Sequence, residues 1–158
     1  WLDVPTEGWG KFDVSDCWGV LHHGGDAAAG LKGLVGVLAE DGGMGLMVYG
    51  ALGRTGVYHV QEMLRTIAPD EQAPQQRIKA ARRLLGALPK TNWFARHPFV
   101  GDHVHCGDDG LYDLLLHSRD RPFRRAYFEA LFRTAGLQPS SVYGPAPPAP
   151  LREPLPHT

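Results

Sequence analysis

The chain has 158 residues, 43% of them apolar, and its 16 basic and 17 acidic side chains nearly cancel. This length suits one domain or part of one, and the balanced charge gives no overall attraction for nucleic acid or an anionic membrane. Because it has no apolar run near the roughly 20 residues that span a bilayer, no signal-peptide pattern and only two distant cysteines, we expect a cytoplasmic protein without disulfides.

A first strand is predicted at Phe12 to Cys17, after a turn-rich segment that contains Asp3. The aromatic and β-branched residues of this run favour a buried strand. The run leads into the corner Gly-Val-Leu-His-His, which ends with His22 and His23. In open α/β sheets small ligands bind beyond the carboxyl ends of strands, so we expect the corner to open onto a polar crevice.

A helix and a second strand are predicted next. Asp26 is a good N-cap, and a helix from Asp26 to Asp41 would place four apolar residues on one face: Leu31, Leu34, Val35 and Leu38. Met44 to Tyr49 is a continuous apolar run, which is typical of a strand covered on both faces. The order strand, helix, strand predicts a right-handed crossover between two adjacent parallel strands.

The glycine-rich loop at residues 50–56 leads into a helix with one apolar stripe, formed by Val57, Val60, Leu64 and Ile67. Such a loop can bind an anion through its backbone N–H groups, with help from Arg54. Its spacing matches neither the GxGxxG nor the GxxxxGK[ST] motif. We therefore favour a tight turn in which Thr55 caps the helix.

The helix predicted at Pro74 to Leu88 carries a basic face that is directed largely outward and consists of Arg77, Lys79, Arg82 and Arg83. Such a face can bind RNA phosphates, but isolated charged faces are usually only solvated. Aromatic side chains that could stack on bases are not interleaved with these charges, so we do not expect nucleic acid as a partner.

A cluster of potential metal ligands lies in and after the irregular segment 90–107: Asp102, His103, His105, Cys106, Asp108 and Asp109. The pattern His-x-His beside carboxylates suits zinc or iron. No further His or carboxylate pair at helical spacing completes a site, so we predict no bound metal. A metal-dependent hydrolase that uses His103 and His105 stays an alternative.

The last third of the chain is predicted to be mainly helical. Asp109 is expected to cap a short helix that carries Asp113 and His117 on a different face from its leucines. Pro122 is expected to begin another helix, whose aromatic residues join the core and which stops at Gly136. A short strand near residue 142 and a proline-rich tail at residues 144–158 are expected to follow.

Longer motifs resemble a known family. FDVSDCWGVLHH, followed by a helix and then GGMGLMVYG, resembles the fourth strand, following helix and fifth strand of a class I S-adenosylmethionine-dependent methyltransferase. GRTGVYHVQEMLR and GLYDLLLHSRDRPF resemble one bacterial subgroup of mostly unassigned substrate. The resemblance covers residues 3–137 and implies a three-layer α/β fold, a partial Rossmann-like sheet from the fourth strand onward with a mainly helical carboxyl-terminal part. Residues 1–143 would then be the carboxyl-terminal part of a methyltransferase domain.

The resemblance also implies roles for single residues around S-adenosyl-L-methionine. Asp3 would meet the adenine amino group, and the methionyl part would be lined by Cys17, Trp18 and Gly19. A solvated carboxylate at Asp3 and simple packing at Cys17 are the alternatives that the residues themselves leave open. The catalytic pair would be His22 and His23, one as a general base and one holding the loop by hydrogen bonding. The methyl acceptor, a small molecule or a protein, would be bound by Tyr49, Arg54, Tyr58 and His117.

Methyl transfer is a direct displacement that requires alignment and sometimes a base, but neither a metal nor a covalent intermediate. We expect the chain to start between the third and fourth strands of the family's sheet, without its glycine-rich cofactor loop and ribose-binding carboxylate. The chain alone should then bind the cofactor roughly 10³-fold more weakly or worse. The unpaired edge of the first strand should favour self-association. A non-catalytic binding or assembly module of the same fold is the other alternative.

Overall fold

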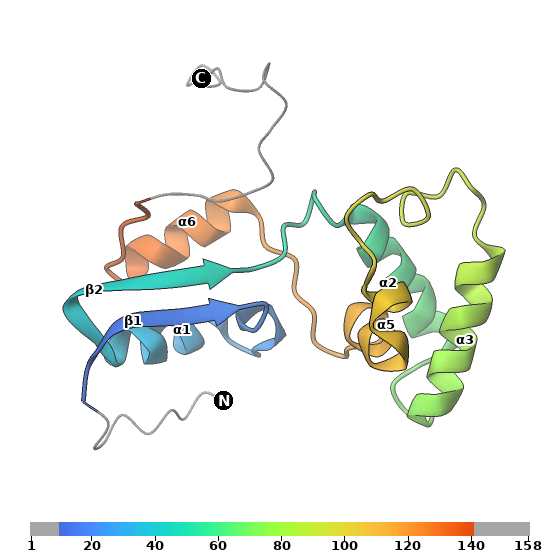
Figure 1. The fold of residues 1–158 in the computed structure, drawn as a ribbon, viewed down its shortest axis with the longest axis horizontal. Helices are drawn as coiled ribbons and strands as arrows, with labels where there is room; N and C mark the ends of the chain where they lie inside the picture. Colours follow the sequence, from blue (N-terminus) through green and yellow to red (C-terminus); the bar gives the residue numbers. More distant parts are fainter. Residues whose placement is uncertain (1–9, 141–158) are drawn as a thin grey trace, which may run out of the picture.

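The computed structural model describes residues 10–140, which form two parts (Figure 1). The sheet half consists of two strands with the helices α1 and α6, and the helical half consists of α2 to α5. In chain order the elements are β1 (Phe12–Trp18), the 3₁₀ helix η1 (Leu21–His23), α1 (Ala27–Gly36), β2 (Leu38–Met47), α2 (Thr55–Ile67), α3 (Pro74–Ala87), α4 (Asp102–His105), α5 (Gly107–Leu115) and α6 (Arg125–Thr134). Asp3, the strand expected near residue 142 and the proline-rich tail lie outside the described residues.

β1 and β2 are adjacent and parallel, as predicted, with Cys17 opposite Leu46. α1 connects them and begins as predicted, because the Asp26 side chain accepts hydrogen bonds from two N–H groups of the first turn, at 2.9 and 3.2 Å. Both strands run toward the helical half, so their carboxyl ends meet at the junction of the two halves (Figure 1). The fold is therefore a mixed α/β fold with a parallel pair of strands.

α1 is shorter and β2 is longer than the sequence predicted. α1 ends at Gly36 rather than at residue 41, and β2 begins at Leu38 rather than at residue 44. Glycine disfavours a helix, so Gly36 weakens its end, and the Val37 carbonyl accepts a hydrogen bond from the Phe12 N–H at 2.8 Å. The boundary was misplaced because valine and leucine suit a helical stripe and a strand equally well.

Helices cover one face of the sheet. Alternate residues of β2 pack in one apolar cluster with Cys17 of β1, Leu31 of α1 and Leu131 of α6. Side chains alternate between the faces of a strand, and on the opposite face of β1 Val14 and Trp18 are 69% and 65% exposed. The sheet half thus forms two layers instead of the expected three, and the run at residues 44–49 is half-buried throughout rather than fully enclosed.

The helical half has its own apolar core. α2 contributes Val57, Val60 and Leu64, as predicted, whereas Ile67 at its end is exposed. The remaining buried members come from α3, α5 and the segments beside them: Ile78, Ala81, Phe94, Leu111, Leu114, Leu115 and Leu116. None of the helices that the structure describes is both long and apolar enough to cross a membrane.

Arg77 of α3 is buried, contrary to the expectation that it belongs to an outward basic face. The residue is 4% exposed, and its guanidinium donates to the carbonyls of Ala68 at 3.0 Å and Leu116 at 3.1 Å. It also donates to the Tyr112 hydroxyl at 3.0 Å and forms an ion pair with Asp70. The five donors of a guanidinium let one side chain connect several segments, so Arg77 ties the end of α2 to α3 and α5.

Several helix starts differ from the predicted caps. Arg54 occupies the N-cap of α2, and Thr55 lies inside the first turn, where its hydroxyl donates to a carbonyl of the preceding loop at 2.8 Å. α5 begins before Asp109 and α6 begins after Pro122. Gly136 ends α6 as predicted, with φ of +75°. Polar residues therefore locate a helix start to within a few residues, while the tertiary contacts decide which of them is the cap.

A short parallel bridge connects the end of β2 to the segment that precedes α6. The Phe123 N–H donates to the Tyr49 carbonyl at 3.0 Å, and the Ala51 N–H donates to the Phe123 carbonyl at 2.8 Å. The chain therefore returns from the helical half along the carboxyl end of β2, and this return brings residues 117–123 to the junction.

Candidate functional site

The two strand ends converge on a buried polar site at the junction. His22 lies in η1, directly after β1, and is 1% exposed. Its ring lies against that of Tyr49, which follows β2, with the ring centroids 4.4 Å apart. The Arg121 N–H donates to the His22 carbonyl at 3.1 Å. Residues from two distant parts of the chain therefore fix the position of this histidine.

Arg54 covers the ring of Tyr49, with its guanidinium carbon 3.4 Å from the ring centroid. This is a cation–π contact of a guanidinium that is almost withdrawn from solvent. Burial raises the pKa of Tyr49, and Arg54 opposes the rise. Burial, reinforced by Asp120, raises the pKa of Tyr58 to about 12. Both phenols are therefore protonated near neutral pH and act as neutral hydrogen-bonding groups.

The pKa of His22 is lowered to about 4. Burial is the largest cause, the neighbouring His23 adds to it, and Asp120 opposes it. An imidazole with this pKa is uncharged at neutral pH and is a weak base. His22 is thus suited to hydrogen bonding in its neutral form, and it is a poorer general base than the sequence suggested.

Buried polar atoms without a hydrogen-bond partner in the described part of the chain are concentrated here. Five of the six residues that carry such atoms lie here, namely His22, Arg54, Tyr58, Gln61 and Asp120, and the sixth, His103, lies in the helical half. Gln61 and Asp120 are satisfied in part, since the Gln61 side-chain amide donates to the Asp120 carboxylate at 2.8 Å. An unpaired buried polar atom costs about 1–3 kcal/mol, and in native proteins it often serves a ligand or a reaction. Their concentration at the strand ends therefore marks a candidate site.

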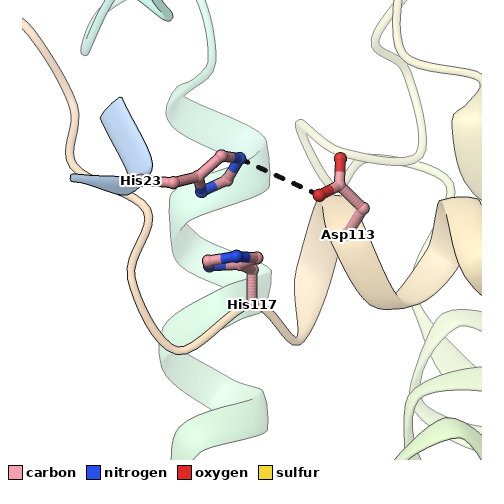
Figure 2. A group of neighbouring side chains, drawn as sticks. All are labelled: His23, Asp113 and His117. Carbon is pink, nitrogen blue, oxygen red and sulfur yellow. Dashed lines mark ion pairs between the residues drawn. The ribbon is translucent and has the colours of Figure 1, made fainter. Parts of the chain in front are cut away.

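A second group of side chains lies beside this site and consists of His23, Asp113 and His117 (Figure 2). The Nδ1 atom of His23 donates to the Arg119 carbonyl at 2.6 Å. Because a carbonyl only accepts, Nδ1 carries the proton, and in the neutral ring Nε2 keeps its lone pair. Nε2 faces the Asp113 carboxylate, with 3.8 Å between Nε2 and Oδ1 (Figure 2). His23 is therefore the member of the histidine pair that is tethered by hydrogen bonding.

The three imidazoles form a continuous row. The ring centroids of His22 and His23 are 4.0 Å apart, and those of His23 and His117 are 3.9 Å apart. The Arg119 N–H donates to His117 Nδ1 at 3.1 Å, so the segment after α5 holds both His23 and His117. Burial decreases along the row, from the enclosed His22 to the half-buried His23 and His117.

The residues assigned to the methionyl part of the cofactor have different surroundings. Gly19 has φ of +69°, and a Cβ there would lie 3.9 Å from His22 and 4.0 Å from the Tyr49 hydroxyl. The Gly19 backbone thus comes close to the site. Cys17 is buried in the core of the sheet half, where burial raises the pKa of its thiol, and Trp18 is exposed. Asp3 lies outside the described residues.

The expected catalytic and acceptor-side residues lie together. The contacts above connect His22, His23, Tyr49, Arg54 and His117 into one group. Tyr58, on the first turn of α2, lies close enough to Arg54 and Asp120 for both to influence its pKa. Four separate segments of the chain therefore contribute to one site.

Sequence reasoning missed Gln61, Asp113 and Asp120 as members of the site. Gln61 interrupts the apolar stripe of α2, and a polar residue in such a stripe indicates a buried hydrogen bond, here to the Leu114 carbonyl at 2.9 Å. Asp113 precedes His117 by four residues, a spacing that places two side chains on one face of the predicted helix, although α5 ends at Leu115, before His117. Asp120 lies in a polar loop segment, and its sequence gave no comparable indication.

The other group of potential ligands, around His103 and His105, is not gathered into a site. His103 packs against the ring of Phe94 at 4.9 Å between centroids, and burial lowers its pKa. His105 is exposed. Across residues 10–140 the structure brings three or more potential ligands together only at His23, Asp113 and His117.

Comparison with known proteins does not identify a family. No family model matches the chain. A protein of Synechococcus sp. that is described only as uncharacterized is 31% identical over 88 residues, which are 55% of this chain and 21% of that protein. The match therefore covers about a fifth of the relative's length, and it carries no activity with it.

Proposed function

We propose that the chain is the carboxyl-terminal part of an S-adenosylmethionine-dependent methyltransferase domain. The observation that carries the proposal is the convergence of two parallel strand ends on a buried polar site at which His22, Tyr49 and Arg54 meet. In open α/β sheets this is the place where small ligands bind. The sequence motifs that resemble class I methyltransferases span the same residues.

On the cofactor side, Gly19 is the residue best suited to contact the methionyl part. It has no side chain, and its backbone comes close to His22 and Tyr49 at the end of β1. The exposed Trp18 offers an aromatic surface on the same corner. A positively charged sulfonium is attracted by such aromatic faces and by nearby carbonyls, so this corner suits the reactive end of the cofactor.

On the acceptor side, proton transfer is assigned to His23 rather than to His22. His22 is neutral but weakly basic, because its pKa is about 4. His23 keeps an accessible Nε2 lone pair, and the nearby Asp113 carboxylate would stabilise the imidazolium that forms when the acceptor gives up its proton. The acceptor itself would be oriented by Tyr49, Arg54 and Tyr58. The Arg54 guanidinium and the Tyr58 hydroxyl each have a buried polar atom without a hydrogen-bond partner among the described residues, so both could bind it.

The acceptor is a small molecule or a protein side chain that carries polar groups. Arg54 and the phenols favour an acceptor with an oxygen or carboxylate substituent near the reacting atom. A binding or assembly module with the same fold would use the same site without turnover. The metal-dependent hydrolase has less support, because His103 and His105 are not gathered with further ligands.

The test is a titration with S-adenosylhomocysteine in which NMR chemical shifts of the backbone amides are measured. Weak binding is expected, and NMR detects weak binding site by site. We expect the largest shifts at the corner from Trp18 to His23. Shifts that are absent at millimolar ligand, or that lie in the helical half away from the junction, would contradict the proposal.

Two variants sharpen the test. Gly19→Val should abolish the shifts, because φ of +69° strains a β-branched residue and the new side chain meets Met47 and His22. Tyr49→Phe should leave them in place, because it removes only a hydroxyl on the acceptor side. Transfer of a labelled methyl group to candidate acceptors then separates a methyltransferase from a binding module, which would bind without transferring.

A further inference from the structure

We propose that His23, Asp113 and His117 bind a divalent transition-metal ion, in the first place zinc(II). One potential ligand atom from each of the three lies within 4.8 Å of the others (Figure 2). Two imidazoles and one carboxylate are a ligand set that suits zinc and iron(II). The inference stands apart from methyl transfer and reverses the expectation, drawn from the sequence, that no metal binds.

The hydrogen bonding of His23 already orients its ring for metal coordination. Its Nδ1–H is held by the Arg119 carbonyl at 2.6 Å, which fixes the tautomer and the direction of the ring. Metal-binding histidines characteristically donate their second ring nitrogen to a carbonyl or carboxylate in this way. The lone pair of Nε2 then points toward Asp113 (Figure 2).

Small side-chain movements complete the coordination. Ligand atoms at about 2.0–2.1 Å from a tetrahedral zinc lie roughly 3.4 Å from one another. The Nε2 atom of His23 and the Oδ1 atom of Asp113 are 3.8 Å apart, close to this spacing. Asp113 is mostly exposed, so its carboxylate is free to turn toward the ion. Three protein ligands leave at least one position open for water or another ligand.

His117 must change its hydrogen bonding when the ion binds. Its Nδ1 accepts from the Arg119 N–H, so in the neutral ring the proton is on Nε2. Coordination through Nδ1 displaces the Arg119 N–H, and coordination through Nε2 moves the proton to Nδ1 and breaks the same bond. Metal binding should therefore be reported by the Arg119 amide as well as by the ligands themselves.

The metal and the proposed general base exclude one another. Both require the lone pair of His23 Nε2, so an ion held there would prevent His23 from accepting a proton. Zinc would accordingly inhibit a methyl transfer that depends on His23. The binding test below makes no use of activity, so the two proposals can fail separately.

The experiment is a titration of the full chain with cobalt(II), whose visible absorption reports coordination, followed by competition with zinc(II). We expect visible bands that zinc abolishes, together with a shift of the Arg119 amide in NMR spectra recorded with zinc. Asp113→Asn and His117→Ala should each weaken cobalt affinity by at least about 10-fold, since even supporting residues of a metal site typically contribute this much.

His59→Ala is the matched control, because it removes an exposed histidine of α2 that lies outside the group. It should leave the affinity unchanged, and the circular dichroism of all variants should match that of the parent chain. Affinity that is equal in the parent chain and in the Asp113 and His117 variants would place the metal elsewhere and overturn the proposal. Failure to bind cobalt or zinc at millimolar concentration would overturn it too.

Discussion

The sheet half and the helical half differ in how far their side chains are buried and hydrogen-bonded. In the helical half a buried charged residue, Arg77, reaches carbonyls, a hydroxyl and a carboxylate, and the apolar stripe of α2 is closed over by α3 and α5. In the sheet half Val14 and Trp18 lie exposed on one face. Most of the unpaired buried polar atoms of the described residues gather where the halves meet, and His103 is the exception. The complete hydrogen bonding of Arg77 thus marks a contact that stabilises the fold, and the unpaired atoms at the junction mark a place that is available for a ligand.

The largest effect is expected from removing the buried guanidinium of the helical half. Arg77→Ala leaves the carbonyls of Ala68 and Leu116 buried without a donor, at about 1–3 kcal/mol each. We expect the free energy of unfolding to fall by about 3 kcal/mol or more, measured by urea denaturation.

Arg83→Ala is the control for this prediction, because Arg83 is an exposed residue of the same helix. It should change the free energy of unfolding by no more than about 0.5 kcal/mol. If both variants lost a similar amount of free energy of unfolding, the positive charge of arginine rather than the buried contacts of Arg77 would be responsible. The contrast between the halves would then be wrong.

The second prediction concerns the close packing of α2. A Cβ at Gly56 would lie 2.5 Å from the backbone nitrogen of Phe94, closer than real contacts allow. Gly56→Ala should therefore lower the free energy of unfolding by about 1–3 kcal/mol, because the segment at Phe94 has to move.

Gly86→Ala, in α3, is the opposite case, because nothing lies within 4 Å of the added carbon. Alanine is the better helix former, so this variant should raise the free energy of unfolding by about 0.5–1 kcal/mol. The two substitutions are chemically identical, and their effects on the free energy of unfolding should have opposite signs. A gain at Gly56 would show that the helical half is packed less tightly than its contacts indicate.

The third prediction uses pH. Burial lowers the pKa of His103, with its neighbours His105 and Arg82 adding to the shift and Asp102 opposing it. The unfolded state then binds more protons than the folded state below the ordinary pKa of about 6.5. The contribution of neutral His103 is complete above that pH and is lost as the pH falls toward the lower pKa of the folded state. His103→Leu should therefore lose less stability than the parent chain when urea denaturation is repeated at about pH 5 instead of about pH 7.

An NMR titration of the same residue provides the direct check. The ring of His103 should titrate below the ordinary range in the parent chain. If it titrates at or above that range, or if His103→Leu loses as much stability with acid as the parent chain does, then His103 is not withdrawn from water by Phe94.

The fold was predictable from the sequence where the cause is local. The cap at Asp26 and the run after it predict the crossover between β1 and β2, because a single side chain and a continuous apolar segment are enough to specify them. The burial of Arg77 was not predictable. Its acceptors at Ala68 and Leu116 are supplied by other segments of the fold, and a basic residue read alone is assigned to solvent.

The residues of the candidate site were likewise predictable only where the cause is local. His22 and Tyr49 follow the two strands directly, so the rule that ligands bind at strand ends was sufficient to select them. Asp113 and Asp120 lie far from both strands in sequence, and only the return of the chain along the end of β2 brings them near. The sequence was enough to identify the residues that follow each strand. It was not enough to identify the residues of the helical half that lie next to them.

The smallest effect on stability, and the sharpest test of the exposed sheet, is expected from Val14→Lys. β1 pairs with β2 on one side only within residues 10–140, and Val14 is among its most exposed side chains. Such an edge with apolar side chains favours pairing with a second copy of the chain, and a lysine there opposes it. Sedimentation should show concentration-dependent association of the parent chain and weaker association of Val14→Lys, with the free energy of unfolding changed by no more than about 0.5 kcal/mol. Leu52→Lys, at an even more exposed apolar position in the loop before α2, should leave association unchanged. If both variants weaken association alike, general hydrophobicity rather than the edge of β1 is responsible. If neither does, the sheet half does not self-associate through β1.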